Sequence, residues 1–348
     1  DFLAGSNALL AASPFSTSFF NAFEQHFDLE NYIDYFVFET YAQNTDWLGL
    51  AWGLNNIKTF RAAPDQPWRY LMYDTDAGFG FFGANVNDNF IDWARNPGSP
   101  SVHSNLFDKV LLNNTFRLRF INRYADLINT MFQPDHFNQE VAEMVNMMSG
   151  SMAPHIDRWN SPASYGDWLG AINNLTDHNS NRVNTARNHL KNSFGLPSDF
   201  ECTLDVFPPP AGVVRVNTIT PGPLPWSGVY FEECPIQLEA IAEEGWMFDS
   251  WDNNQHIISG NMNPNIRTTT VSIFTNDLYR ARFAPCPDDA AATIVSTNGI
   301  LSVSLDNIPY ADSIAWKLEG NFVGSGMEWA PNSDGTYTAE VYFDGCSS

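Results

Sequence analysis

Residues 44–80 read NTDWLGLAWGLNNIKTFRAAPDQPWRYLMYDTDAGFG, and this stretch decides how the first 200 residues are interpreted. The side chains in it that can carry chemistry are Asp46, Asn55, Asn56, Asp74 and Asp76. Two strand-like runs, Ile57–Arg61 and Trp68–Tyr73, flank the turn-forming sequence Ala-Pro-Asp-Gln-Pro and predict a β-hairpin. Because a hairpin fixes the distance between the loops at its ends, we expect the two acidic loops to meet at one site.

Phosphoryl transfer needs an acid that orients or deprotonates the acceptor hydroxyl, and oxygen ligands that hold Mg²⁺ against the phosphates. Asp46 fits the first role, and an asparagine at 55 or 56, together with Asp74 and Asp76, fits the second. Two acids one residue apart are also common by chance in an acidic chain. The Asp74–Gly78 run could therefore be a surface turn or a structural Ca²⁺ loop, and Asp46 could simply cap a helix.

The first 200 residues are predicted to be mainly helical. Apolar residues recur at helical spacing from Leu29 to Tyr41, and Asp28 is a plausible N-cap for that helix. A similar pattern runs from Phe116 to Met131. Further helices are expected at Asp135–Ser149, Ser164–Asn174 and Asp177–Phe194, and the last is expected to stop at Gly195 and Pro197.

After Phe200 the chain changes to short alternating runs separated by Gly, Pro and Asn, which predict β-strands. We divide the chain into three domains: residues 1–200, a small β module at 201–287, and a β-sandwich at 288–348. The expected strands are Thr203–Phe207, Val213–Val216, Val229–Phe231, Ile236–Ala242, Thr268–Phe274, Tyr279–Phe283, Ile294–Val295, Leu301–Leu305, Ile314–Leu318 and Tyr337–Phe343.

Composition excludes several classes of protein. The chain has 348 residues and a formal net charge of −23, a sign that repels nucleic acid and anionic membranes. It contains no apolar run of the roughly 18 residues that a membrane-spanning helix requires, so no membrane span is expected.

The four cysteines all lie after residue 200 and contain no Cys-x-x-Cys pair, which favours disulfides over zinc. Three pairings are open for Cys202, Cys234, Cys286 and Cys346. A Cys202–Cys286 bond, which would close both ends of the first β module, is the pairing we consider first.

The order of the blocks along the first 200 residues closely resembles the CotH family of secreted atypical protein kinases. The resemblance covers about residues 19–200, and it is specific because several blocks agree in order and spacing. These blocks are Asn31–Tyr35, Asn44–Trp47, Asn55–Arg61, Trp68–Gly80, Phe107–Asn113, Phe116–Tyr124 and His155–Trp159.

The resemblance implies a mainly helical α+β kinase C-lobe and assigns a role to each site residue. Asp46 corresponds to the catalytic-loop aspartate, Asn55 or Asn56 to the amide beside the metal, and Asp74 and Asp76 to the metal-binding acids. Kinases of this type transfer phosphate from ATP, held with Mg²⁺ or Mn²⁺, to Ser or Thr of extracellular or spore-coat proteins. An extracellular protein substrate or surface ligand is the partner this implies.

In the family, a lobe with a phosphate-contacting lysine and its partner glutamate lies N-terminal to this region. Only 30 residues precede Asn31 in this sequence, and Lys58 lies on the hairpin and does not correspond to that lysine. We therefore expect this chain to hold the C-lobe without the nucleotide-binding half, and to be inactive by itself.

The β-rich part resembles modules of secreted bacterial proteins. Val216–Ile219, Pro225–Phe231 and Gly245–Trp251 resemble the divergent B-repeat, a small β-grasp-like unit. The last segment, ending in Gly335–Thr338 and Gly345-Cys346, resembles the Ig-like or PKD-like domains of Bacteroidetes-type secreted proteins. Both resemblances imply an extracellular or cell-surface location.

Two other functions are compatible with this sequence. One is a non-catalytic surface or adhesion scaffold with a CotH-like domain. The other is a Ca²⁺-stabilised carbohydrate-binding protein or hydrolase, in which close acids act as general acid and nucleophile. Arg117, Arg119 and Arg123 could contact phosphate, although salt bridges are favoured for them, and a packing or capping role is favoured for His155.

Overall fold

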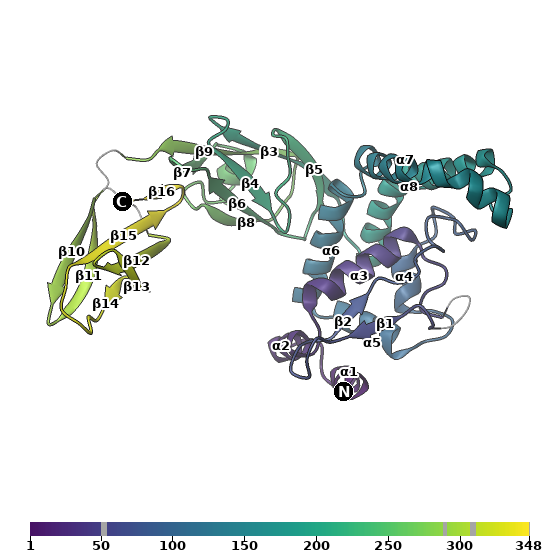
Figure 1. Ribbon diagram of the computed structural model, residues 1–348, viewed down its shortest axis with the longest axis horizontal. Coiled ribbons are helices and arrows are strands. Elements are labelled where there is room, and N and C mark those ends of the chain that lie inside the picture. The colour runs from purple at the N-terminus through teal and green to yellow at the C-terminus, as the bar shows by residue number, and fades with distance from the viewer. Residues whose placement is uncertain (50–53, 288–290, 307–310, 348) are drawn as a thin grey trace. The chain divides into compact units, whose positions relative to one another are not determined.

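The computed structural model describes residues 1–49, 54–287, 291–306 and 311–347. The chain divides into two compact units (Figure 1). We call the first, Asp1–Asp199 with Val229–Cys234, the helical unit, and the second, Phe200–Gly228 with Pro235–Ser348, the β-rich unit. The predicted combination of helices with several small sheets is confirmed. The finer division of the β-rich unit into two domains stays a prediction.

The helical unit contains eight of the helices and one two-stranded sheet of the described chain. Its helices are α1 (Phe2–Ala11), α2 (Thr17–His26), α3 (Leu29–Ala42), α4 (Phe90–Arg95), α5 (Val102–Leu111), α6 (Asn114–Asn129), α7 (Pro134–Trp159) and α8 (Tyr165–Phe194), and its strands are β1 (Lys58–Phe60) and β2 (Arg69–Leu71).

Helix α3 is the central element of the helical unit. Asp28 caps its N-terminus as predicted, accepting a hydrogen bond from the backbone N–H of Asn31. The Phe36 ring on α3 is fully buried and stacks on Phe107 of α5 at 4.2 Å between ring centroids. Aromatic packing therefore holds the helix whose C-terminus leads into the candidate site.

The predicted hairpin is confirmed, and it docks on α3. Strands β1 and β2 pair antiparallel, with Thr59 opposite Tyr70. The Asn31 side chain on α3 donates to the carbonyl of Tyr70 at 3.0 Å and accepts from its N–H at 2.7 Å. These two bonds fix the hairpin on the helix, so the loops that enter and leave it have set positions.

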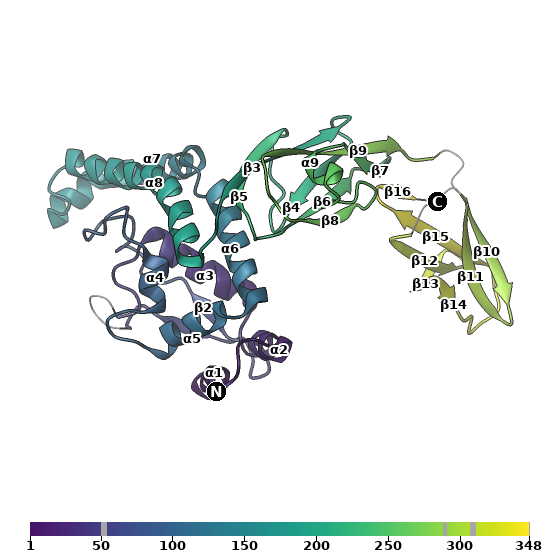
Figure 2. The same cartoon turned by 180° about the vertical axis from the view of Figure 1, so that it is seen from behind.

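Helices α7 and α8 form a long pair that lies side by side in both views (Figures 1 and 2). The prediction of separate helices at Ser164–Asn174 and Asp177–Phe194 is wrong, because α8 runs unbroken from Tyr165 to Phe194. Helix α7 also continues past Ser149 to Trp159, through Pro154. In α7, packing along α8 offsets the local cost of Gly150 and Pro154, residue types that local patterns take as helix stops. The break predicted in α8, at Leu175 and Thr176, contains neither residue type.

The β-rich part of the chain forms four small sheets, with strand orders β5-β3-β9-β7, β4-β6-β8, β10-β11-β14 and β13-β12-β15-β16. Strands β3 and β9 pair in parallel, whereas the other described pairings in this part are antiparallel. The strands are β3 (Asp199–Phe207), β4 (Gly212–Val216), β5 (Trp226–Phe231), β6 (Ile236–Ala242), β7 (Trp246–Trp251), β8 (Thr268–Val271), β9 (Asp277–Pro285), β10 (Ala291–Thr297), β11 (Ile300–Asp306), β12 (Ser313–Leu318), β13 (Asn321–Ser325), β14 (Glu328–Trp329), β15 (Tyr337–Phe343) and β16 (Cys346–Ser347), with the short helix α9 (Gln255–Ile258) between β7 and β8.

The disulfide in the β-rich unit joins Cys286 to Cys346, so the Cys202–Cys286 pairing is wrong. Cys202 and Cys234 are free and buried. The bond connects the end of the first β module to the last strand, where Arg267 also forms ion pairs with Asp312 and Asp344 at 2.9 and 2.6 Å. Which cysteines meet is decided by packing between segments distant in sequence, which spacing does not reveal.

Among the residues that the structure describes, no helix combines the length and apolarity needed to cross a membrane.

Candidate functional site

The site begins where α3 ends. Gln43 closes the helix in the left-handed conformation, with φ at 57°. Its side-chain N–H₂ group donates to the carbonyls of Asn85 and Asp88 at 2.8 and 2.7 Å, and its side-chain oxygen lies 2.8 Å from His178 Nε2. These three contacts of the Gln43 side chain fix the direction in which the chain leaves α3.

Asn44 links the end of α3 to Asp46 through hydrogen bonds. The fully buried Asn44 side chain donates from Nδ2 to Glu39 Oε2 at 2.9 Å, and its Oδ1 accepts from the backbone N–H of Asp46 at 3.0 Å. Asp46 Oδ2 in turn accepts from Asn56 Nδ2 at 2.8 Å. One carboxylate oxygen of Asp46 is thus held by the side-chain amide of a residue ten positions further along the chain.

Backbone hydrogen bonds join the loop after α3 to the loop after β2. The N–H and the hydroxyl of Thr45 both donate to the carbonyl of Ala77 at 3.2 Å, and the Phe79 N–H donates to the carbonyl of Ala42 at 2.6 Å. Because Asp46 and Asp76 are each next to a bonded residue, the two loops bring their acids to one place. The expectation that the acidic loops meet is confirmed.

The second loop has an unusual backbone. Asp74 and Phe79 have φ of 54° and 52°, a region that residues with a Cβ rarely adopt. Such strain tends to persist where surrounding contacts impose it, and it is concentrated at functional sites. Gly78 is packed so closely that a Cβ there would lie 3.2 Å from the Thr75 carbonyl oxygen and 3.3 Å from the Ala42 Cβ.

The three acids act on one another electrostatically. Partial desolvation raises the pKa of Asp46, the hydrogen bond from Asn56 lowers it, and the charges of Asp74 and Asp76 raise it. Asp74 and Asp76 are themselves exposed. A cation bound beside these carboxylates would reduce this repulsion.

Asp74 and Asp76 are the candidate ligands for the predicted Mg²⁺ or Mn²⁺. The described residues contain no group of three or more His, Cys, Asp or Glu placed to hold a metal ion. Mg²⁺, however, is usually held by one or two carboxylates, with substrate phosphates and waters completing its shell. Asp74 and Asp76 supply hard oxygens of that kind. The Ca²⁺ reading of the Asp74–Gly78 loop stays a prediction.

The structure brings Asp46, Asn56, Asp74 and Asp76 together. Asn56 is buried and is the amide that contacts Asp46, whereas the neighbouring Asn55 side chain is exposed. Which of these two asparagines contacts a metal ion stays a prediction.

The remaining candidate residues have structural contacts. Arg123 and Arg119 pair with Asp34 and Glu30, which confirms the favoured salt bridges for these two. Arg117 donates to the amide oxygen of Asn114, so its salt bridge is not confirmed. His155 is exposed and bonds the carbonyl of Ser161 just after α7 ends.

Sequence patterns missed Glu39. This carboxyl is fully buried on α3, and its Oε1 has no hydrogen-bond partner among the described residues. Burial raises its pKa to about 7, while the Asn44 amide lowers it. Glu39 lies three residues after the core residue Phe36, so its burial could have been inferred from the helical repeat.

Sequence patterns also missed Arg182 on α8. Its buried guanidinium donates to the carbonyls of Tyr41 and Thr40 at 2.9 and 3.1 Å, at the C-terminal end of α3. A cation there satisfies carbonyls that the helix leaves unpaired and suits the negative end of the helix dipole. Arg182 therefore anchors the helix end that leads to Asp46.

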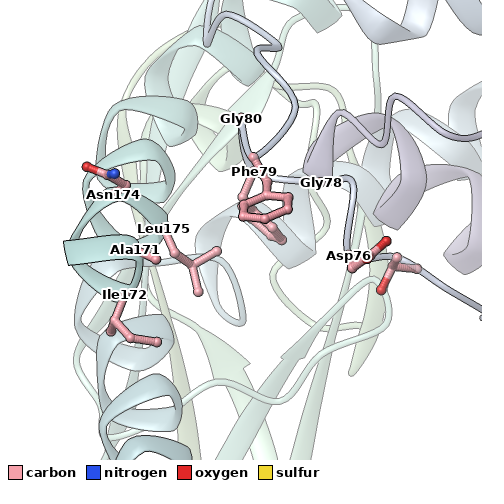
Figure 3. Close-up of a pocket in the computed structure, with 10 residues that line it drawn as sticks. Asp76, Gly78, Phe79, Gly80, Ala171, Ile172, Asn174 and Leu175 are labelled. Atoms are coloured by element: carbon pink, nitrogen blue, oxygen red, sulfur yellow. The ribbon is translucent and has the colours of Figure 1, made fainter. Parts of the chain in front are cut away.

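A pocket of about 500 Å³ adjoins the site, between the loop around Phe79 and helix α8 (Figure 3). Asp76 lies on one side of it, and Ile172 and Leu175 project from α8 on the other.

Comparison with known families identifies the family of the helical unit. The helical unit carries acids on two loops that are joined by hydrogen bonds. A family model described as CotH kinase protein matches residues 3–185. The chain belongs to the CotH kinase family. The match lies within the helical unit and includes α1 and α2, which precede the motifs seen in the sequence. No curated protein and no solved structure matches the chain.

Proposed function

We propose that this chain is the acceptor- and metal-binding part of an atypical protein kinase that transfers the γ-phosphoryl group of ATP to Ser or Thr of extracellular proteins. The observation that carries the proposal is the joining of Asp46 to Asp74 and Asp76 on two hydrogen-bonded loops, in a chain of the CotH kinase family.

In this proposal Asp46 accepts the proton of the acceptor hydroxyl, or orients that hydroxyl toward the phosphate. Its raised pKa places it closer to the working pH than that of an ordinary aspartate. Asn56 holds one of its carboxylate oxygens, so the carboxylate is oriented before substrate arrives. Asp74 and Asp76, with an amide from Asn55 or Asn56, would hold Mg²⁺ or Mn²⁺, which neutralises charge on the phosphates.

An extracellular or surface location is part of the same proposal. The Cys286–Cys346 disulfide supports it, because such bonds persist in oxidising compartments. The net charge of −23 suits a protein that binds neither nucleic acid nor anionic lipid.

Thermal unfolding with and without nucleotide separates the kinase from a non-catalytic scaffold. A ligand present at 100 times its dissociation constant stabilises the folded state by about 2.7 kcal/mol. We expect ATP with Mn²⁺ to raise the melting temperature of the full-length protein, and Asp74→Asn to remove that rise. An unchanged melting temperature in the wild type would favour the scaffold.

A further inference from the structure

Asp46 lies between two residues whose side chains are buried and bonded back to α3. On one side, Asn44 donates from Nδ2 to Glu39 Oε2 at 2.9 Å, and on the other, Trp47 donates from Nε1 to the Tyr35 hydroxyl at 2.9 Å. Tyr35 and Glu39 are four residues apart, so they lie on the same face of α3. We call Tyr35, Glu39, Asn44 and Trp47 together the α3 clamp, and each has an exposed fraction of 2% or less.

The α3 clamp reaches Asp46 through the side-chain amide of Asn44. A backbone N–H can only donate and a carboxylate can only accept, so the amide fits between Asp46 and Glu39 in one orientation. In that orientation its Oδ1 accepts from the Asp46 N–H at 3.0 Å while its Nδ2 donates to Glu39. Without the Glu39 acceptor, the buried Nδ2 group loses its partner among the described residues, and the amide can turn only by releasing the Asp46 N–H.

The ionised form of Glu39 holds this amide more strongly than the neutral form. Burial raises the pKa of Glu39 to about 7, so both forms are populated near neutral pH. The hydrogen bond from Asn44 acts in the other direction and lowers this pKa, which means that the bond favours the carboxylate. By linkage, the carboxylate equally favours the bond, as expected for a donor that faces a charge.

The groups around Glu39 do not themselves change charge near neutral pH. Tyr35 is in electrostatic contact with Glu39, and burial raises the pKa of its phenol far above the neutral range. His103 on α5 stays neutral, because burial lowers its pKa to about 4. Charged groups in the loop after α3 and on the elements packed against this helix are bonded to partners other than Glu39, and they include Asp46, Arg69, Arg95, Arg123, Asp126 and Arg182.

We propose that Glu39 is a positioning residue that holds Asp46 in its reactive orientation through Asn44. This inference rests on the proposed kinase function and adds a regulation by pH: phosphoryl transfer rises as Glu39 ionises. Stability changes in the opposite direction, because a raised folded-state pKa gives stability that is complete below the ordinary value of 4.5 and is lost as the pH rises through about 7. A residue with only a packing role would lower activity and stability together.

Nuclear magnetic resonance of the full chain tests the positioning without any catalysis. In protein isotope-labelled at aspartate nitrogen and glutamate carboxyl carbon, the Glu39 carboxyl and the Asp46 backbone N–H should titrate with one shared midpoint, at about pH 7. In Glu39→Gln, which keeps an acceptor but cannot ionise, both transitions should disappear. Glu30→Gln makes the same change at an exposed residue of the same helix, and it should leave both transitions in place.

Steady-state kinetics of the full-length protein test the consequence for phosphoryl transfer. In the wild type, kcat should rise between pH 6 and pH 8. Glu39→Gln should lower kcat at pH 8 about tenfold, the effect of losing one hydrogen bond to a charged group, and should leave the KM for ATP unchanged. Glu30→Gln should match the wild type throughout.

Three results would overturn the inference. They are an Asp46 N–H signal that does not move as Glu39 titrates, a transition at about pH 7 that persists in Glu39→Gln, and a kcat at pH 8 that this substitution leaves unchanged. If Glu39→Gln does not fold, the two midpoints in the wild type still decide, because separate midpoints exclude the link. If the midpoints coincide but the wild-type full-length protein transfers no phosphate, the kinase proposal fails and the link from Glu39 to Asp46 stands.

Discussion

Two regions of the molecule gather ionisable side chains, and they differ in what surrounds them. In the helical unit, Asp74 and Asp76 are exposed and raise the pKa of Asp46. In the β-rich unit, His256 is fully buried, with its Nδ1 2.6 Å from Asp277 Oδ2 and 3.0 Å from the Tyr279 hydroxyl.

The buried cluster has the residue types of a nucleophilic site, since Cys202 lies beside Tyr279. Burial, however, raises the pKa of the Cys202 thiol to about 12, so it carries no thiolate at neutral pH. The partners of the cluster also satisfy one another. Residue type alone therefore does not identify a site. We expect the exposed acids Asp74 and Asp76, which raise the pKa of Asp46, to be the group that binds a ligand.

The largest expected effect is a loss of phosphoryl transfer, which we expect from a change in the acids of the helical unit. Asp46→Asn should lower phosphoryl transfer by the full-length protein about 10²- to 10⁴-fold, since it removes the proton acceptor, and should leave the melting temperature unchanged. Transfer of labelled γ-phosphate to a protein acceptor measures it. Asp65→Asn, at an exposed turn residue, is the control. Equal activity of both variants would exclude Asp46 from the chemistry.

The buried cluster should respond in the opposite way. His256→Ala removes its bonds to Asp277 and Tyr279 and leaves those groups buried, which should lower the free energy of unfolding by about 3 kcal/mol. Denaturant unfolding measures this loss, and Mn²⁺ binding should not change. His155→Ala, at an exposed ring, should stay within about 0.5 kcal/mol of wild type. An unchanged stability for His256→Ala would mean that the cluster is not structural.

Glu39 should make stability depend on pH. Its pKa is about 7 in the folded chain against 4.5 as the ordinary value, so the folded state binds the proton more tightly. The stabilisation is complete below pH 4.5 and is lost as the pH rises through about 7, by roughly 3 kcal/mol at most. Unfolding followed from pH 4.5 to 8 should show this slope, and Glu39→Gln should flatten it. A slope that persists in Glu39→Gln would assign it to other groups.

The smallest effect concerns the strained backbone. Asp74→Gly relieves the left-handed conformation and should raise the free energy of unfolding by up to about 1 kcal/mol, while weakening Mn²⁺ binding at least tenfold. Asp74→Asn tolerates the same conformation, so it should lose the metal without gaining stability. Lower stability for the glycine variant would mean that the Asp74 side chain supports the fold.

Local sequence patterns predicted several helices and strands of the fold. Helix α3 with its Asp28 cap, the hairpin, and strands β6 and β15 follow from apolar spacing and turn residues, because these features are decided within a few residues. Asp46, Asp74 and Asp76 were assigned through the order and spacing of blocks that resemble the CotH family, and their roles stay predictions.

What the patterns missed depends on contacts distant in sequence. Glu39 and Arg182 are polar residues buried by packing, and their roles follow from partners such as Asn44 and the end of α3. Strand β7, Trp246–Trp251, was not predicted as a strand, because its apolar residues do not alternate regularly and its register shifts between Phe248 and Ser250.

A calorimetric titration of the full chain with Mn²⁺, in the wild type and in Asp74→Asn/Asp76→Asn, tests the central claim most directly. If the open acids form a metal-dependent phosphoryl-transfer site, the wild type should bind Mn²⁺ at this site, and the double variant should lose that binding while keeping its melting temperature. Equal Mn²⁺ binding by the two proteins would contradict the claim.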